Sequence, residues 1–372
     1  MEHELLNLQN QVQTAYAKGT PLRIQAGGTK QFYGEAVAPD AQLLDVSAHR
    51  GVVAYDPDEL VLVVKAGTRL QEIEDLLATR QQILPFEPPH FGDSASIGGA
   101  VATALAGARR IHVGAPRDFV IGCQMIDGKG QILRFGGRVV KNVAGFDVHK
   151  LMTGSLGTLG VLSEIALKVL PAPFFTQTLC LSQTAAQARD TMTALMRQPL
   201  PLSGTFWHDN RLFLRLSGTE KGVAAAQAKI GGDVLANDEA TRFWLDVREQ
   251  RLPFFTLSPN ERLWRISLPH GVPDLALNGE FCMEWGGLLR WYRSNLSAQE
   301  IRAQVHAVGG HATLFRGVPN AGESVFDALP LGNAAIQQRL KQLFDPKGIF
   351  NPNRLRFAAD AVCNLEASCK RD

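Results

Sequence analysis

Glycine is concentrated in one stretch of this chain, since residues 92–160 contain fourteen of the thirty-five glycines. A residue without a Cβ allows sharp turns and a close approach of the backbone to a neighbouring group. Together with an earlier Gly-Gly turn, the chain has three glycine-bearing segments next to expected strands: 25–31 (QAGGTKQ), 94–103 (SASIGGAVAT) and 154–161 (GSLGTLGV). Such segments favour loops that bind a ligand through backbone amides, in the manner of an anion nest.

Taken singly, each glycine segment also fits an ordinary turn or a close-packed helix start. The sequence has no G-x-x-x-x-G-K-[ST] and no G-x-G-x-x-G, which disfavours P-loop NTPases and the usual dinucleotide-binding fingerprint. Zinc-binding spacings and a G-x-S-x-G nucleophile elbow are also missing from the sequence. We therefore expect no metal site, and we expect any nucleotide to be held in another way.

The charge balance and the cysteine content indicate which partners and which cellular compartment to expect. The 38 basic and 36 acidic residues leave a net charge of +2, so no strong overall field draws the chain to nucleic acid or anionic lipid. No apolar stretch reaches the ~18–20 residues of a transmembrane helix, and the N-terminus lacks the pattern of a signal peptide. The five cysteines are scattered and odd in number. We expect reduced thiols, a cytoplasmic location and no transmembrane segment; the role of Cys363 and Cys369 stays open.

Two regions differ in pattern, and the prolines at 171 and 173 separate them. The first has short, apparently mixed strands at 22–26, 60–65, 120–126, 131–135 and 159–169, with a helix at 70–79. The second contains all five tryptophans and a partly repeated strand–helix–strand–strand–helix order, in which we expect 281–293 to form one strand. This order predicts an α+β fold whose second region is an antiparallel sheet with helices on one face.

A resemblance to a known family rests on several of these segments together. The run 114–173 and the segment 344–355 (FDPKGIFNPNRL) resemble the FAD-binding domain of the vanillyl-alcohol-oxidase superfamily, also called the PCMH type. The segment 25–31 resembles its pyrophosphate loop, and 96–103 its second FAD-binding segment. The resemblance implies an FAD-binding PCMH-type domain at 1–173 plus 333–357, an antiparallel-sheet cap domain at 174–332 and a flexible tail at 358–372.

The same resemblance implies the residues that bind FAD. The pyrophosphate loop comprises Gly27, Gly28, Thr29, Lys30 and Gln31, and the segment that lines the flavin comprises Ser96, Gly98, Gly99 and Thr103. The ribose and adenine side is formed by Gly157, Thr158, Gly160 and Val161. Asn351 lies near the isoalloxazine. Many members attach FAD covalently through a histidine at the end of the pyrophosphate loop. This loop has none, so we expect non-covalent FAD, and we expect His90 to be a surface loop residue.

Within the superfamily, the short cap and the run at 138–160 are similar to the smaller, E-type flavin subunits of bacterial glycolate oxidases. This implies two partners, a larger catalytic flavin subunit and an iron–sulfur subunit, and a complex that acts on a small 2-hydroxy acid. Through such a complex the chain could lie at the inner face of the cytoplasmic membrane.

Independent catalysis is a separate question. Oxidation of a 2-hydroxy acid needs a base for the hydroxyl proton and a cation for the carboxylate. Catalytic relatives carry histidine in a cap segment that corresponds to 278–287, where this chain has none. The remaining candidates are Arg290, Arg316 and His311, although a solvated strand edge is the more common role for such residues. Three hypotheses stay open: a flavin subunit that supports electron transfer, a self-sufficient 2-hydroxy-acid dehydrogenase, and an assembly subunit without redox activity.

Overall fold

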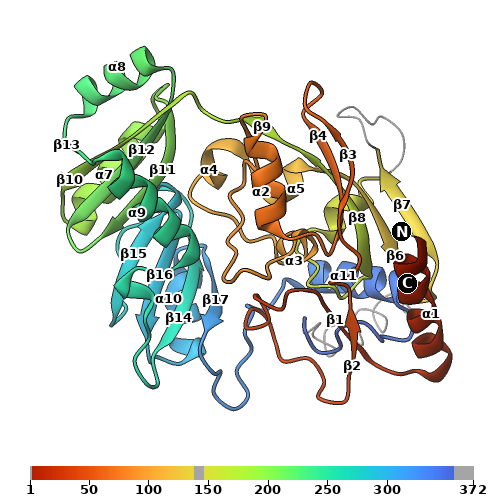
Figure 1. Ribbon diagram of the computed structural model, residues 1–372. Helices are drawn as coiled ribbons and strands as arrows, with labels where there is room; N and C mark the ends of the chain where they lie inside the picture. Colours follow the sequence, from red (N-terminus) through yellow and green to blue (C-terminus); the bar gives the residue numbers. More distant parts are fainter. Residues whose placement is uncertain (1, 138–145, 356–372) are drawn as a thin grey trace, which may run out of the picture.

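Two antiparallel sheets stand side by side in the computed structural model, which describes residues 2–137 and 146–355 (Figure 1). The five-stranded sheet has the order β3 (Val52–Asp56), β4 (Val61–Lys65), β8 (Val161–Lys168), β6 (Val120–Ile126), β7 (Ile132–Gly136). The eight-stranded sheet has the order β13 (Asp233–Val234), β10 (Phe175–Ser182), β12 (Arg211–Gly218), β11 (Leu202–His208), β15 (Glu280–Glu284), β16 (Leu289–Ser294), β14 (Arg262–Ser267), β17 (His311–Arg316). The protein therefore has an α+β fold, as the sequence predicts.

The five-stranded sheet supports the first hydrophobic core. All five residues of β4 are buried, because apolar groups cover both faces of this strand. Helices α1 (Glu2–Lys18), α2 (Leu70–Ala78) and α3 (Ile97–Thr103) contribute apolar side chains to the same core. Shorter elements complete this part of the chain: α4 (Arg110–Val113), α5 (Pro116–Phe119), α6 (Val148–Met152), and the paired strands β5 (Gln82–Ile83) and β9 (Leu170–Pro171).

The end of the described chain returns to its beginning. Strand β1 (Leu22–Gln25) pairs in parallel with β2 (Gln42–Asp45). After helix α11 (Leu331–Phe344), the backbone lies beside β1: the Leu22 amide donates to Ile349 at 2.7 Å, and the Asn351 amide donates to Leu22 at 2.8 Å. Ile349 and Phe350 belong to the first core, so their burial holds this return in place.

The eight-stranded sheet carries helices on both faces, which corrects the expectation of one helical face. Apolar residues of α7 (Ala185–Met196) and α8 (Glu220–Ile230) pack on one face, as do those of α10 (Ala298–Ala307). Helix α9 (Asn237–Glu249) instead packs on the opposite face, in a cluster that also contains Tyr33, Leu105 and Leu156 from the first part of the chain. Its apolar side therefore faces both the sheet and the rest of the protein.

Two further expectations need correction. Residues 281–293 form β15 and β16 rather than one strand, because Trp285, Gly286 and Gly287 have positive φ and turn the chain in a short 3₁₀ segment. The strands of the five-stranded sheet are all antiparallel, and the described parallel pair is β1 with β2. The hairpin between β11 and β12 turns at Asp209-Asn210, and both residues have positive φ.

Some expectations fall outside what the structure describes. The expected tail at 358–372, with Cys363 and Cys369, lies outside the described residues, as does 138–145 of the family-like run. The described cysteines, Cys123, Cys180 and Cys282, are free and buried. Among the described helices, none is both long and apolar enough to cross a membrane.

Candidate functional site

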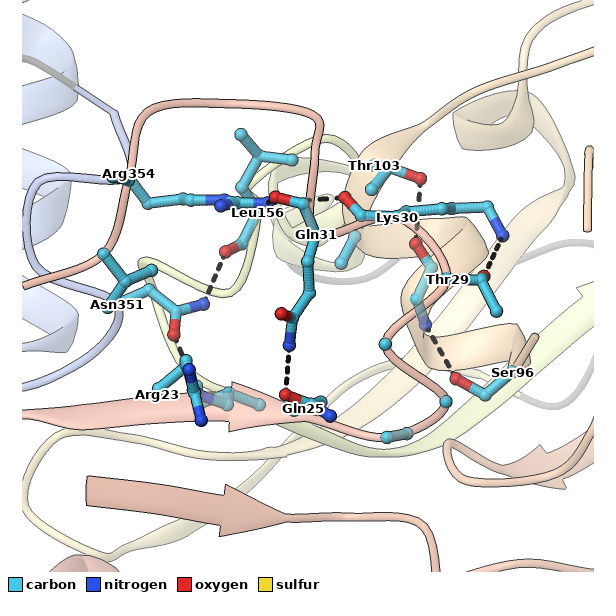
Figure 2. Close-up of a pocket in the computed structure, with 18 of the residues that line it drawn as sticks. Arg23, Gln25, Thr29, Lys30, Gln31, Ser96, Thr103, Leu156, Asn351 and Arg354 are labelled. Atoms are coloured by element: carbon cyan, nitrogen blue, oxygen red, sulfur yellow. Dashed lines mark hydrogen bonds between the residues drawn. The ribbon is translucent and has the colours of Figure 1, made fainter. Parts of the chain in front are cut away.

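A cavity of about 360 Å³ lies where the Gly27–Gly28 loop, defined as residues 25–31, meets α3 and the C-terminal return (Figure 2). Strand β1 leads into the loop, Ser96 and Thr103 come from the start and end of α3, and Asn351 and Arg354 come from the return. The turn at 36–39 forms another part of the wall. Segments that are more than 300 residues apart in the sequence thus build one site.

The loop presents unsatisfied backbone donors. Within the described chain, no acceptor takes the amide hydrogens of Gly27, Gly28, Thr29 or Lys30. Gly28 has φ +70, a conformation that glycine adopts without strain. Buried amides are normally paired, and a run of free ones at a cavity wall is suited to an anion with several acceptor oxygens. A pyrophosphate is such a group.

Arg354 holds the opposite side of the same loop. Its guanidinium donates to the Gln31 carbonyl at 2.8 Å, and Figure 2 shows both side chains. It also donates to the carbonyls of Tyr33 at 2.6 Å and Glu35 at 3.1 Å. With these carbonyls occupied by the arginine, the loop is fixed in one conformation. From the sequence, no role was assigned to Arg354, which belongs to the C-terminal segment 344–355. Its position three residues after Asn351 could have indicated a place at the same site.

Close packing explains the glycines around the cavity. A Cβ built on Gly27 would lie 1.6 Å from the Ser94 carbonyl oxygen, and Ser94 Oγ donates to the Gly27 carbonyl at 2.8 Å. A Cβ on Gly98 would lie 2.8 Å from the carbonyl oxygen of Ala66, which accepts the Gly98 amide. The two glycine segments therefore approach neighbouring backbone more closely than any other residue could.

A second hollow of about 90 Å³ adjoins the first and is lined by Gly98, Gly99, Gly157 and Gly160. Asn351 is shared by both hollows. Its Oδ1 accepts the Ile24 amide at 2.8 Å, and its Nδ2 donates to the Leu156 carbonyl at 2.7 Å. This buried side chain joins β1 to the third glycine segment.

Most residues expected to bind the cofactor thus line one of the two hollows, and two do not. Thr158 is buried, its hydroxyl donates to the Ser155 carbonyl at 2.7 Å, and its own carbonyl accepts from Lys341 at 2.7 Å. Val161 begins β8 within the core. Arg23, Gln25, Leu156 and the turn at 36–39 also line the larger cavity, and sequence reasoning did not single them out.

Lys30 and His90 meet beside the loop. The Lys30 ammonium donates to the His90 carbonyl at 3.1 Å and lies 5.8 Å from the centre of the Phe91 ring. Burial lowers the pKa of Lys30 to about 8. His90 is only 8% exposed, and its Nε2 lies 3.1 Å from Glu74. The expectation of a surface histidine is therefore wrong, because carboxylates pair with both its ring and its backbone amide.

The three catalytic candidates occupy different environments. Arg290 is 1% exposed and donates to the carbonyls of Val272 and Pro273, so it fixes a loop on the outer side of β16. His311 is exposed at the start of β17. Arg316 lies among aromatic rings, 5.0 Å from the centre of Phe32 and 5.1 Å from that of Phe91, and it has no carboxylate within ion-pair distance in the described chain. Of the three, Arg316 lies nearest the Gly27–Gly28 loop in the fold, and none of them lines the two hollows.

Comparison with known proteins agrees with this geometry. Residues 4–136 match the family described as an FAD binding domain. The glycolate oxidase subunit GlcE of Escherichia coli strain K12 is 46% identical over 348 residues, which cover 94% of this chain and 96% of that protein.

Other relatives match a part of the chain. A mitochondrial D-lactate dehydrogenase [cytochrome] of Arabidopsis thaliana is 30% identical over 48% of this chain and 31% of its own length. The glycolate oxidase subunit GlcD of Bacillus subtilis strain 168 is 29% identical over 43% of this chain and 34% of its own length. Among solved structures, an alkyldihydroxyacetonephosphate synthase has a TM-score of 0.64 at 16% identity, covering 94% of this chain and 75% of that one, which shows a shared fold.

Proposed function

Because the chain belongs to the family of the glycolate oxidase subunit GlcE, we propose that it is the FAD-binding subunit of a glycolate oxidase complex. In this role it supports oxidation of glycolate to glyoxylate by flavin-mediated electron transfer. FAD, when bound, accepts the two electrons that glycolate loses. The FAD-binding domain comprises 1–173 plus 333–357, and the cap domain comprises 174–332.

The observation that carries this proposal is the run of four free amides at the wall of the larger cavity. Gly27, Gly28, Thr29 and Lys30 hold the pyrophosphate through these donors, and Arg354 keeps the loop in the required conformation. The glycines at 98, 99, 157 and 160 leave room for the remainder of the cofactor in the adjoining hollow. Asn351 joins the two hollows and lies near the isoalloxazine end.

Non-covalent attachment is part of the proposal. The Gly27–Gly28 loop contains no histidine, and the His90 ring is engaged by Glu74. The cofactor is then held by hydrogen bonds and packing alone.

The chain acts together with partners, a larger catalytic flavin subunit and an iron–sulfur subunit, and it transfers electrons rather than oxidising glycolate itself. Between Gly107 and the eight-stranded sheet, Trp285, Trp291 and Phe315 leave a space of about 20 Å³. That is room for about one water molecule and too little for a hydroxy acid. The absence of histidine at 278–287 favours the same division of labour.

An absorbance spectrum of the purified chain, repeated on the supernatant after acid precipitation, tests cofactor binding. We expect flavin bands that move into the supernatant. Colour that stays in the pellet would contradict non-covalent attachment. A colourless chain that takes up no added FAD would contradict the flavoprotein assignment and favour the assembly subunit.

A pair of glycine variants tests the place of binding. Gly28→Glu puts a carboxylate beside the proposed pyrophosphate and should abolish FAD uptake by repulsion. Gly322→Glu is the matched control, because Gly322 also has positive φ and has open space around it. Equal FAD uptake by both variants would place the pyrophosphate elsewhere.

Arg316 favours a second candidate function, a self-sufficient dehydrogenase. It is a partly buried cation without a carboxylate partner in the described chain, and it is aimed at the aromatic residues beside the loop. Addition of glycolate to the FAD-loaded chain separates the two functions. Flavin bleaching by the chain alone, lost in Arg316→Met, would support the dehydrogenase; bleaching only after the partner subunits are added supports the proposed subunit.

A further inference from the structure

A second cavity of about 360 Å³ lies between the two sheets, and we propose that it binds a small organic carboxylate. It shares no lining residue with the proposed FAD cavity. One wall comes from Glu87, Ala108 and Arg109, which precede α4. The other comes from β10, β12 and α9, with the lining residues Thr176, Thr178, Arg215, Asn237, Ala240, Thr241, Trp244, Leu245 and Arg248.

The cavity wall carries an excess of positive charge. Arg215 pairs with Glu87 at 2.8 Å, and Arg109 Nε lies 3.3 Å from the same carboxylate. Two guanidinium groups thus share one carboxylate, which leaves one positive charge without a partner among the described residues. The third cation, Arg248, pairs with two carboxylates, Glu74 at 3.1 Å and Glu249 at 2.8 Å, so the unpaired positive charge lies on the Glu87 side of the cavity.

The charges of the same two arginines also act on the nearby His112. Burial, followed by the charges of Arg215 and Arg109, lowers the pKa of His112 to about 4. His112 is therefore neutral at pH 7 and adds no charge, and its Nε2 has no partner in the described chain. The uncompensated charge stays with the two arginines. A partly buried cation that lacks a counter-ion favours binding of an anion from solution.

A guanidinium pairs bidentately with a carboxylate or with a phosphate, and the apolar part of the cavity wall favours the carboxylate of a small organic acid. Arg215 already donates to Glu87 at 3.0 Å, and the central carbon of its planar guanidinium lies 4.8 Å from the centre of the Trp244 ring. A planar guanidinium with free N–H groups pairs with a second carboxylate in the same way. The walls also include Ala108, Ala240 and Leu245, which suit a short carbon skeleton, and the cavity volume lies within the range of small-molecule sites.

Binding there would join the two halves of the molecule. Glu87 and Arg109 belong to the part built on the five-stranded sheet, whereas Arg215 and Trp244 belong to the eight-stranded sheet and its inner helix. A bound acid would therefore contact both and stabilise their packing.

Isothermal titration of the full chain, loaded with FAD so that the first cavity is filled, tests the proposal. The probes are succinate, glycolate, inorganic phosphate and the neutral analogue succinamide, each up to about 10 mM, where even a weak ion pair registers. We expect saturable binding of at least one carboxylate and none of succinamide. No binding of either acid overturns the proposal, as does tighter binding of phosphate.

Three variants fix the location. Arg109→Met removes the uncompensated charge and should weaken binding at least about tenfold. Thr241→Trp keeps every charge but fills the cavity mouth, and it should weaken binding similarly. Arg242→Met removes an equal charge from an exposed neighbouring position on α9 and should leave binding unchanged. Unchanged affinity in both Arg109→Met and Thr241→Trp, with native unfolding curves, would overturn the proposed site.

Discussion

Gly27 shows how one missing Cβ shapes the proposed cofactor site. A Cβ there would lie 1.6 Å from the Ser94 carbonyl oxygen, so Gly27→Ala must displace the backbone that supports α3. We expect FAD affinity, measured by titration of the apoprotein, to fall by more than about tenfold. Gly332→Ala is the control: it has open space in α11 and should leave affinity unchanged while stabilising the helix by up to about 1 kcal/mol. Equal affinities for both variants would contradict this account.

Glu284 predicts a pH dependence of stability. Burial raises the pKa of this carboxyl to about 7, although Trp291 Nε1 donates to it at 2.7 Å. The folded state then holds a proton that the unfolded state has released, so the free energy of unfolding falls as pH rises from about 4.5 to about 7. Glu284→Gln keeps the acceptor for Trp291 without the charge. We expect it to be more stable at pH 8 by an amount on the order of 2–3 kcal/mol, and similar to wild type at pH 4.5.

Urea unfolding of both proteins between pH 4.5 and pH 8 measures this difference, because all other titrating groups are common to the pair. Parallel pH profiles would show that the Glu284 carboxyl titrates normally.

At the scale of elements, the Asn351 side chain adds two hydrogen bonds to those that join β1 and the C-terminal return. Asn351→Asp keeps an acceptor for the Ile24 amide but places a carboxylate oxygen against the Leu156 carbonyl. We expect a loss of about 2 kcal/mol of unfolding free energy, together with weaker FAD binding. Asn353→Asp is the control, since Asn353 also has positive φ but is exposed. Chemical denaturation should separate the variants; equal stability would show that the Asn351 contacts contribute little.

Some structural elements could be predicted from the residue types at a position, and others could not. Asp209-Asn210 is a turn by its residue types alone, and the structure has a hairpin there. The break between β15 and β16 was not predictable, because it requires positive φ at Trp285, a residue that rarely adopts it. Helix α9 is apolar on the side that packs, but its sequence does not say which face of the sheet receives that side.

At the scale of the whole molecule, the glycine segments that line the two hollows could be picked out from the sequence, but the contacts between the two sheets could not. The Gly27–Gly28 loop is recognisable because its close packing at Gly27 and its positive φ at Gly28 need residues without side chains at adjacent positions. The Glu87–Arg215 pair spans 128 residues, and neither residue belongs to a motif. Charged side chains are common, so only the fold shows which of them meet. For the same reason, the cavity lined by Glu87, Arg109 and Arg215 could not be predicted from the sequence.

Glu87 therefore gives the test of how the two sheets are held together. Burial alone would raise the pKa of this carboxyl, but Arg215 and Arg109 outweigh that effect and hold the pKa below its usual value. Glu87→Gln leaves two buried guanidinium groups without a counter-ion, and we expect a loss of about 3–5 kcal/mol at pH 7. The difference from wild type should shrink as the pH falls below about 4.5, where the carboxylate of the unfolded chain gains a proton, and it should vanish below the lower pKa of the folded state.

Glu280→Gln is the matched control, because Glu280 also pairs with an arginine, Arg293 at 3.2 Å, but is half exposed. It should change the unfolding free energy by no more than about 1 kcal/mol in urea. Because Glu87→Gln frees both arginines, added succinate should recover part of its lost stability and have a smaller effect on wild type. If Glu87→Gln unfolds like Glu280→Gln, the Glu87 ion pairs do not hold the sheets together, and packing around Trp285 and Trp244 must do so instead.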